Sequence, residues 1–225
     1  MQGNSPVQQD IINDLISQCL LSILIPTVYG REELLIKLIQ KIKQKHSWVE
    51  IETDGGNHYG ICYSLPISFL ILKDDKSKTI GEKREDLYKK SFGIFSWQID
   101  DDDDIADNAI QLILEAIKSN PEVDCITFEE YVNIDGVEQR SNHSLQYADW
   151  ANNQDGYDYV RTPFMKSVIK TEIAKSVPIP HIRFGEDHQW AQVLKPHLKT
   201  EIHISEQLYR YIHISSPHNE RYGIK

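Results

Sequence analysis

Five consecutive aspartates, Asp100–Asp104, form the group of side chains in this sequence that is best suited to chemistry. They cannot all be buried and ionised, because each unpaired buried carboxylate would shift its pKa or attract a cation. Carboxylate oxygens suit magnesium, manganese or calcium, and a site with few protein carboxylates leaves coordination positions for substrate phosphates. The run therefore predicts a divalent-cation site. The alternative is a solvated acidic turn that stabilises the start of the next helix.

A second acidic pair, Glu186-Asp187, follows Phe184-Gly185. From the residues alone, both acids are placed to stabilise a helix N-terminus.

Other sites of known chemistry find little support in the sequence. The nine histidines and three cysteines have neither His-Glu-x-x-His nor Cys-x-x-Cys spacing, so zinc chemistry and a disulfide framework are not expected. The sequence has no Gly-x-x-x-x-Gly-Lys-Ser/Thr, Gly-x-Ser-x-Gly or Gly-x-Gly-x-x-Gly motif. A P-loop phosphohydrolase, an α/β-hydrolase and a dinucleotide cofactor are therefore not indicated.

The elements that position these acids alternate along the first half of the chain. Apolar runs predict strands and helical spacing predicts helices at these positions: strands 21–26, 48–53, 67–72 and 95–99, and helices 32–46, 81–92 and 106–119, with 81–92 exposed. Such alternation favours an α/β fold whose ligands lie beyond the carboxyl ends of parallel strands. Both acidic clusters, Asp74/Asp75 and Asp100–Asp104, lie at such ends.

The second half of the chain has a different pattern. After a strand at 123–131, Asn133-Ile-Asp-Gly136 is typical of a tight hairpin, which indicates an antiparallel section. Residues 146–159 mix aromatic with polar side chains, which predicts a binding loop. The remaining expected elements are a weak helix within 1–18, helices at 165–176 and 185–194, a turn at 54–57 and a strand at 207–214.

Length and charge restrict the class of protein. The 225 residues suit one domain at residues 21–225 behind an N-terminal segment, residues 1–20. The net charge is −10, from 24 basic and 34 acidic residues, which disfavours a dedicated nucleic-acid binder. The apolar runs are too short for a membrane helix, and the first residues lack the pattern of a secretion signal, so a cytoplasmic location is expected.

Four segments, in this order, resemble glycosyltransferase family 2: Leu21-Ser-Ile-Leu-Ile-Pro-Thr27, the strand that ends in Asp74-Asp75, Phe95-Ser-Trp-Gln-Ile-Asp-Asp-Asp-Asp103, and Phe184-Gly-Glu-Asp187. The resemblance extends from about Leu21 to about Ile214, and Ile80-Gly-Glu-Lys-Arg84 is similar to short members from bacteriophages and bacteria. The resemblance implies an α/β GT-A (Rossmann-like) fold, with a mostly parallel central sheet, helices on both faces and a small antiparallel section. It also implies inversion of configuration at the sugar.

The resemblance further implies roles for individual residues. Thr27 and either Asp74 or Asp75 correspond to nucleoside contacts, and Lys83 and Arg84 to helix residues that approach the nucleotide. Asp100 and Asp102 correspond to the Asp-x-Asp pair, the first toward ribose or sugar and the second on the metal, although Asp101 and Asp103 form an equally good pair. Asp187, beside Glu186, corresponds to the general base; His213, with His218 as a looser candidate, corresponds to a histidine near the metal and pyrophosphate.

The implied function is an inverting, Mn²⁺- or Mg²⁺-dependent transfer of sugar from a nucleotide-diphosphate sugar, with UDP-sugar first. The acceptor hydroxyl belongs to a glycan, a lipid-linked sugar or, in a phage, a hydroxymethylated DNA base, and Trp150 and Tyr157 in the loop at 147–163 offer flat faces to a sugar ring. Lys73-Asp-Asp-Lys-Ser replaces the usual Asp-Asp-Gly-Ser turn, so uracil specificity rests on the resemblance alone. Two alternatives stay open: a metal-dependent nucleotidyltransferase, although Thr27-Val-Tyr-Gly-Arg31 has only one glycine, and a non-enzymatic calcium-binding adaptor.

Overall fold

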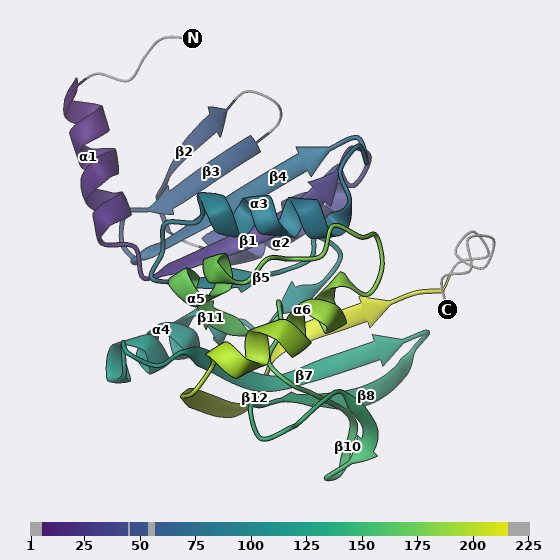
Figure 1. The fold of residues 1–225 in the computed structure, drawn as a ribbon. Helices are drawn as coiled ribbons and strands as arrows, with labels where there is room; N and C mark the ends of the chain where they lie inside the picture. Colours follow the sequence, from purple (N-terminus) through teal and green to yellow (C-terminus); the bar gives the residue numbers. More distant parts are fainter. Residues whose placement is uncertain (1–5, 45, 54–56, 216–225) are drawn as a thin grey trace.

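Three parallel strands form the centre of the sheet in this computed structural model, which describes residues 6–44, 46–53 and 57–215 (Figure 1). They are β4 (Ile67–Asp74), β1 (Leu21–Val28) and β5 (Phe95–Gln98). β1 pairs with β4 from Leu21↔Ile67 and with β5 from Leu21↔Phe95, so all three strands start at the same level. Their carboxyl ends therefore meet at one edge of the sheet, as their continuous apolar sequences predict for buried parallel strands.

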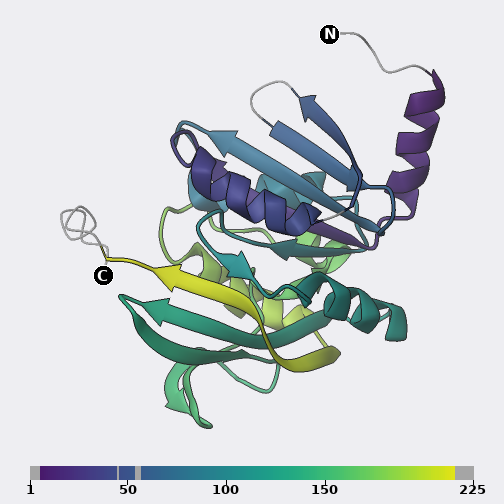
Figure 2. The ribbon, with the colours of Figure 1, turned by 180° about the vertical axis from the view of Figure 1, so that it is seen from behind.

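Helices cover both faces of these strands, because successive side chains of a strand point to opposite faces. On one face Ile23 and Ile25 pack in a core with α2 (Glu32–Lys43) and α4 (Ala109–Ser119). On the other face Leu24 packs in a second core with α3 (Ile80–Lys90), α5 (Thr171–Ser176) and α6 (Glu186–Leu194). Figure 2 shows α2 in front, on the side opposite to α3 in Figure 1.

Two antiparallel strands extend the sheet beyond β4. β3 (Asn57–Cys62) pairs with β4, and β2 (Trp48–Thr53) pairs with β3; α1 (Pro6–Ser17) contacts β3. The polar start of β3 hides it from sequence patterns. Gly60 is required there because a Cβ atom would lie 2.1 Å from the Phe69 ring. The turn expected at 54–57 lies largely outside the described residues.

The other half of the sheet is mostly antiparallel. β11 (Val168–Lys170) joins β5 to β7 (Cys125–Ile134), followed by β8 (Val137–His143), β10 (Tyr157–Arg161) and β9 (Ala151–Gln154). β12 (Glu201–His213) pairs parallel with β7 and antiparallel with β6 (Asp104–Ile105). Antiparallel pairing is therefore more extensive here than the small section that the sequence predicts.

Most elements of the sequence prediction are confirmed, including the tight hairpin between β7 and β8. Asp135 and Gly136 have φ values of 53° and 85°, the left-handed conformations that a two-residue hairpin turn needs. Residues 146–159 do not form a loop but contain the β9–β10 hairpin. The helix expected at 165–176 begins only at Thr171, because Val168 and Ile169 are buried in a strand between β5 and β7.

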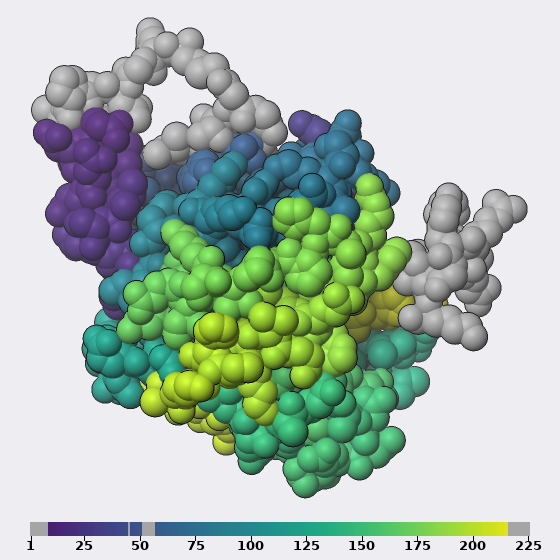
Figure 3. Space-filling view, in the orientation of Figure 1, coloured from purple at the N-terminus to yellow at the C-terminus, as the bar shows by residue number. Residues whose placement is uncertain are grey.

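The segment from α5 to α6 lies across the boundary between the two halves of the sheet in the space-filling view (Figure 3). α3 contacts both of these helices, and its buried face includes Lys83, Arg84, Leu87 and Tyr88. The expectation that 81–92 is an exposed helix is therefore wrong. Within the described residues, no helix has the length and apolar character needed to cross a membrane.

Candidate active site

The first turn of α3 brings Lys83 to the ends of β1 and β4. Its ammonium group donates to the Thr27 carbonyl at 2.7 Å and forms an ion pair with Asp74. A capping box between Thr79 and Glu82 fixes this turn. Burial raises the pKa of Asp74, but Lys83 and backbone N–H groups outweigh it, so the net shift is downward. The structure thus brings together three predicted site residues.

Asp75 does not join this group. Its exposed carboxylate accepts a hydrogen bond from the backbone N–H of Ser77, 3.1 Å away within the same turn. Of the two aspartates that the sequence left open as the nucleoside contact, only Asp74 points toward β1 and α3.

The next residue of α3, Arg84, connects β5 to the start of α6. Its Nη1 and Nη2 atoms lie 2.9 and 3.1 Å from the two carboxylate oxygens of Asp100, and its Nε lies 3.2 Å from Glu186. Nη1 also donates to Gln98 at 2.9 Å. Burial raises the pKa of Asp100, but the fork of Arg84 outweighs it and lowers that pKa overall. Burial raises the pKa of Glu186, against the opposing effect of Arg84.

The aspartate run alternates between buried and open carboxylates. The side chains of Asp101 and Asp103 are 1% exposed, whereas those of Asp100 and Asp102 are 27% and 47% exposed. The sequence did not distinguish Asp100/Asp102 from Asp101/Asp103 as the Asp-x-Asp pair. In the structure only Asp100 and Asp102 face open space.

The two buried carboxylates make internal hydrogen bonds. Asp101 accepts from the Thr27 hydroxyl and lies 3.1 Å from Arg31. Asp103 accepts from the Tyr209 hydroxyl at 2.7 Å and from the Ile212 backbone N–H at 3.3 Å. Burial raises the pKa of Asp101 to about 6 and that of Asp103 to about 7, which reduces the charge that the fold must accommodate.

The predicted metal ligands are only partly brought together. Among the described residues, no group of three or more His, Cys, Asp or Glu side chains could hold a metal ion. The structure places Asp103, a predicted metal ligand, in a buried position against Tyr209. His213 ends β12, where its ring is stacked on Tyr211 at 6.2 Å and its carbonyl accepts from Asp135; His218 lies outside the described residues.

Asp102 is the predicted ligand that fits a divalent ion. Its carboxylate is nearly half exposed and pairs with Arg31 at the end of the loop after β1. One or two carboxylates together with substrate phosphates are a usual environment for Mg²⁺. Asp102 could therefore hold such an ion together with substrate phosphates.

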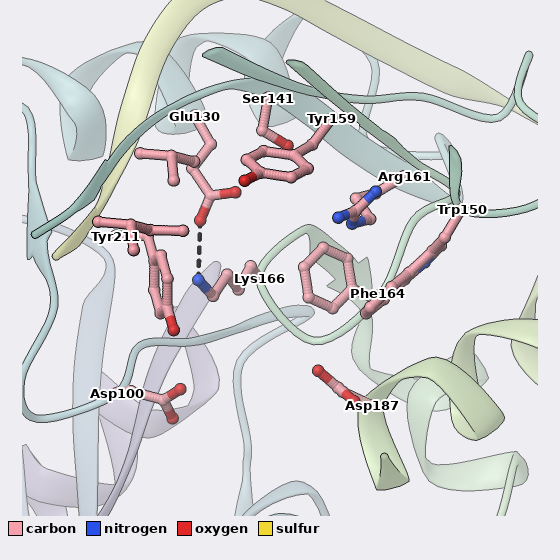
Figure 4. A pocket seen from close by; sticks show the side chains of 12 residues that line it. Asp100, Glu130, Ser141, Trp150, Tyr159, Arg161, Phe164, Lys166, Asp187 and Tyr211 are labelled. Atoms are coloured by element: carbon pink, nitrogen blue, oxygen red, sulfur yellow. Dashed lines mark hydrogen bonds and ion pairs between the residues drawn. The ribbon is translucent and has the colours of Figure 1, made fainter. Parts of the chain in front are cut away.

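A pocket of about 390 Å³ opens beside Asp100 (Figure 4). It lies between the ends of β5 and α6 on one side and the antiparallel strands on the other, and it is lined by Asp100, Glu130, Val132, Ile134, Ser141, Trp150, Tyr159, Arg161, Phe164, Lys166, Asp187 and Tyr211. Asp187 is the second residue of α6 and keeps its carboxylate partly exposed. The expected base and the expected donor-side aspartate thus share one cavity.

Of the two aromatic residues that the sequence analysis singled out in this region, the structure places one in the pocket wall. Trp150 lines the pocket, with its ring against Phe164 at 5.0 Å between centroids. Tyr157 instead donates to Glu129 at 2.7 Å and lies beneath Arg140.

A buried ion pair lies at the back of the pocket. Lys166 donates to Glu130 at 2.8 Å and lies 4.0 Å from the centroid of the Tyr211 ring. Glu130 also contacts His143 at 3.1 Å. Burial raises the pKa of Glu130, but Lys166 and His143 outweigh it and lower that pKa to about 2. The pocket wall is therefore charged and internally paired.

Sequence patterns missed several of these residues. Arg31 carries a usable signal, because a cation in the loop after the first strand of an α/β fold reaches the same edge as the other strand ends. Lys166 and Glu130 carry none, since they meet only through the pairing of β11 with β7. Arg161 likewise lies at the end of a strand that the sequence pattern does not show.

The chain was compared with known proteins. No family model matches it, and no curated protein matches it. Solved structures of Staphylococcus aureus TarS 1–349 do match. The structure of TarS 1–349 has 15% identity over 86% of this chain and 60% of that chain, at a TM-score of 0.58. Its complex with UDP has 17% identity, 91% and 63% coverage and a TM-score of 0.59. Its complex with UDP-GlcNAc has 15% identity, 89% and 60% coverage and a TM-score of 0.59.

These matches concern the fold. The chain spans about three fifths of the length of those structures. The shared arrangement, a mixed α/β fold with a mostly parallel central sheet and helices on its faces, confirms the predicted GT-A fold class.

Proposed function

We propose that this chain is a glycosyltransferase that moves a sugar from a nucleotide-diphosphate sugar to an acceptor hydroxyl. One observation carries the proposal: Asp100, at the end of β5, and Asp187, at the start of α6, line the same pocket, and Arg84 with Glu186 fixes their elements together. The TarS complexes with UDP and UDP-GlcNAc support a nucleotide-sugar donor. The four sequence motifs support membership of family 2 and a relation to its short phage and bacterial members.

We assign the donor nucleotide, with a UDP-sugar first, to the edge where β4, β1 and β5 end. Thr27 and Lys83 are almost fully buried, so they act by holding the Asp101 and Asp74 carboxylates in place. Asp74 accepts hydrogen bonds from the nucleoside and Asp100 from the ribose or sugar. Both are held by a cation of α3, and such pre-organised acceptors orient a ligand without reorganising.

Asp187 is the general base of this proposal. Glu186 pairs with Arg84, whereas Asp187 has no ion pair among the described residues. Its carboxylate can therefore accept the proton of an acceptor hydroxyl in the pocket. If the base and the leaving diphosphate lie on opposite faces of the anomeric carbon, a single displacement inverts the configuration of the sugar. The acceptors that the sequence left open are a glycan, a lipid-linked sugar and a modified DNA base.

A divalent ion, Mn²⁺ or Mg²⁺, belongs to the same proposal, with Asp102 as its protein ligand and Asp100 beside it. When bound, such an ion neutralises charge that develops on the leaving diphosphate. Arg31, which pairs with Asp101 and Asp102, positions the open carboxylate and adds a second positive charge at this edge.

Calorimetric titration of UDP and UDP-GlcNAc, with and without Mn²⁺, combined with UDP-release assays, tests this function. We expect UDP binding whose Mn²⁺-dependent part requires Asp102, and we expect Asp187→Asn to lower turnover by about 10²- to 10⁴-fold while UDP still binds. Asp107→Asn, an exposed carboxylate close after the run, is the matched control. Absence of nucleotide binding would refute the proposal. Release of pyrophosphate from a nucleoside triphosphate would favour a nucleotidyltransferase, and Ca²⁺ binding without any activity would favour an adaptor.

A further inference from the structure

Arg161, the last residue of β10, is held rigidly in the pocket wall. Its guanidinium lies 4.9 Å from the centroid of Trp150 and 5.0 Å from that of Tyr159. Nη1 donates to the carbonyl groups of Ala151 at 2.9 Å and Val160 at 2.8 Å. Two aromatic faces and two backbone acceptors thus fix the cation in one orientation, and Figure 4 shows it across the pocket from Asp187.

Within residues 6–44, 46–53 and 57–215, Arg161 has no carboxylate at ion-pair distance. The other cations of this region are paired: Arg84 with Asp100 and Glu186, and Lys166 with Glu130. Arg161 forms no ion pair with any residue that the structure describes, although it is only partly exposed. A partly buried cation is costly unless an anion compensates it, and Glu130 and Asp187 act on its pKa without forming an ion pair with it.

The same wall holds a buried hydroxyl group that lacks a hydrogen-bond partner among the described residues. Ser141 is 1% exposed, lines the pocket, and its hydroxyl has no hydrogen-bond partner among the described residues. Buried polar groups are normally hydrogen-bonded, so an orphan hydroxyl in a pocket wall indicates a polar ligand. The volume of about 390 Å³ lies within the range of small-molecule sites.

We infer that the acceptor is a sugar that carries an anionic group, a phosphate or a carboxylate, with its oxyanion on Arg161 and its reacting hydroxyl toward Asp187. Arginine is well suited to this task because its planar fork matches both oxyanions. The inference rests on the proposed function for the reacting hydroxyl. It favours a charged sugar unit over a neutral glycan, while the net charge of −10 disfavours a long polyanion such as DNA.

The test is a calorimetric or NMR titration of the full chain with three matched probes: glucose, glucose 6-phosphate and glucuronate. We expect at least one anionic probe to bind about tenfold more tightly than glucose, and the better of the two identifies the oxyanion. Arg161→Gln should remove that preference. Arg140→Gln, which changes an exposed arginine paired with Glu129, should keep it. Equal binding of all three probes, or a preference that survives in Arg161→Gln, would overturn the inference.

Two further measurements separate folding and donor binding from this result. Ser141→Ala leaves the Arg161 contacts intact and should weaken the binding of the preferred anionic probe several-fold. Unchanged binding would count against a polar ligand at this wall. UDP titration of each variant reports whether it is folded and whether the donor site is present. Because the probes are titrated without donor, a failure of UDP to bind refutes the proposed function alone, whereas loss of the anionic preference refutes the acceptor assignment alone.

Discussion

At the residue scale, buried and open side chains alternate along Asp100–Asp104, and this alternation determines which carboxylates are available for chemistry. Sequence predicted a cluster of acids at the end of a strand, because five adjacent carboxylates need counter-charges. It could not choose between Asp100/Asp102 and Asp101/Asp103, because the choice depends on which side of the chain is covered. Thr27, Tyr209 and the backbone of β12 cover Asp101 and Asp103. These partners are distant in sequence, so only the folded structure determines the register.

Arg84 is the residue whose loss should be most damaging. Arg84→Met would leave the buried Glu186 carboxylate and the partly exposed Asp100 carboxylate without their cation, and removal of one partner from a buried ion pair costs about 3–5 kcal/mol. We therefore expect a lower free energy of unfolding in urea and a lower rate of sugar transfer. Arg140→Gln removes a pair in which the arginine is half exposed and should cost about 1 kcal/mol or less. Equal losses in the two variants would contradict this account of Arg84.

The ion pair of Glu130 predicts the pH dependence of stability. The pKa of Glu130 falls from 4.5 to about 2 in the folded chain, so its stabilisation is complete above pH 4.5 and is lost as pH falls toward 2. Glu130→Gln should lower stability at pH 7 and flatten its decline between pH 4.5 and 2. Urea midpoints measured across this range test the prediction. Glu138→Gln, on the neighbouring strand, is the matched control; an unchanged acid decline in Glu130→Gln would show that the pair with Lys166 does not stabilise the fold.

At the element scale, local patterns predicted the type of most elements but not what covers them. α3 has a polar sequence, yet the burial of Lys83 and Arg84 places it between the sheet and α6. β11 lies within Met165–Ser176, which the sequence analysis predicted as a helix, and the position of Val168 and Ile169 between two strands makes it β. Tertiary pairing thus overrides local preference at the elements that carry the site.

Gly81, in the first turn of α3, gives a sharp test of this arrangement. In an exposed helix, Gly→Ala stabilises by about 1 kcal/mol. Here a Cβ atom would lie 1.9 Å from the carbonyl oxygen of Pro180, in the segment that leads to α6. We therefore expect the opposite sign, a loss of about 1–3 kcal/mol, together with reduced transfer because Asp187 is displaced.

Chemical denaturation and UDP-release assays measure both effects of Gly81→Ala. Lys89→Ala, at the exposed end of the same helix, should change stability by less than about 0.5 kcal/mol. If Gly81→Ala stabilises the protein as in an exposed helix, then α3 does not press against this segment and does not set the position of α6.

At the scale of the whole molecule, alternation of strands and helices was enough to predict the α/β fold class, because parallel strands need helical crossovers. The antiparallel half was harder, since β9, β10 and β11 are short and polar or lie in an apolar stretch without a clear period. That half supplies the Arg161, Glu130 and Lys166 side of the pocket. The edge that we assign to the donor was therefore predictable from sequence, whereas the wall that we assign to the acceptor was not.

The edge that we assign to the donor lies in the parallel half of the sheet, and α6 connects that half to the rest of the molecule. Nucleotide binding should therefore stabilise the entire chain. A ligand that binds only the folded state at 100 times its Kd adds about 2.7 kcal/mol to the free energy of unfolding. We expect UDP to give this increase in the presence of Mn²⁺, and Asp102→Ala to lose the Mn²⁺-dependent part because Asp102 is the open carboxylate. Asp107→Asn should retain it. Urea unfolding with UDP, Mn²⁺ or both separates the stabilisation by UDP alone from the part that depends on Mn²⁺. Equal stabilisation by UDP with and without Mn²⁺ would mean that Arg31 and the cations of α3 are enough to bind the diphosphate.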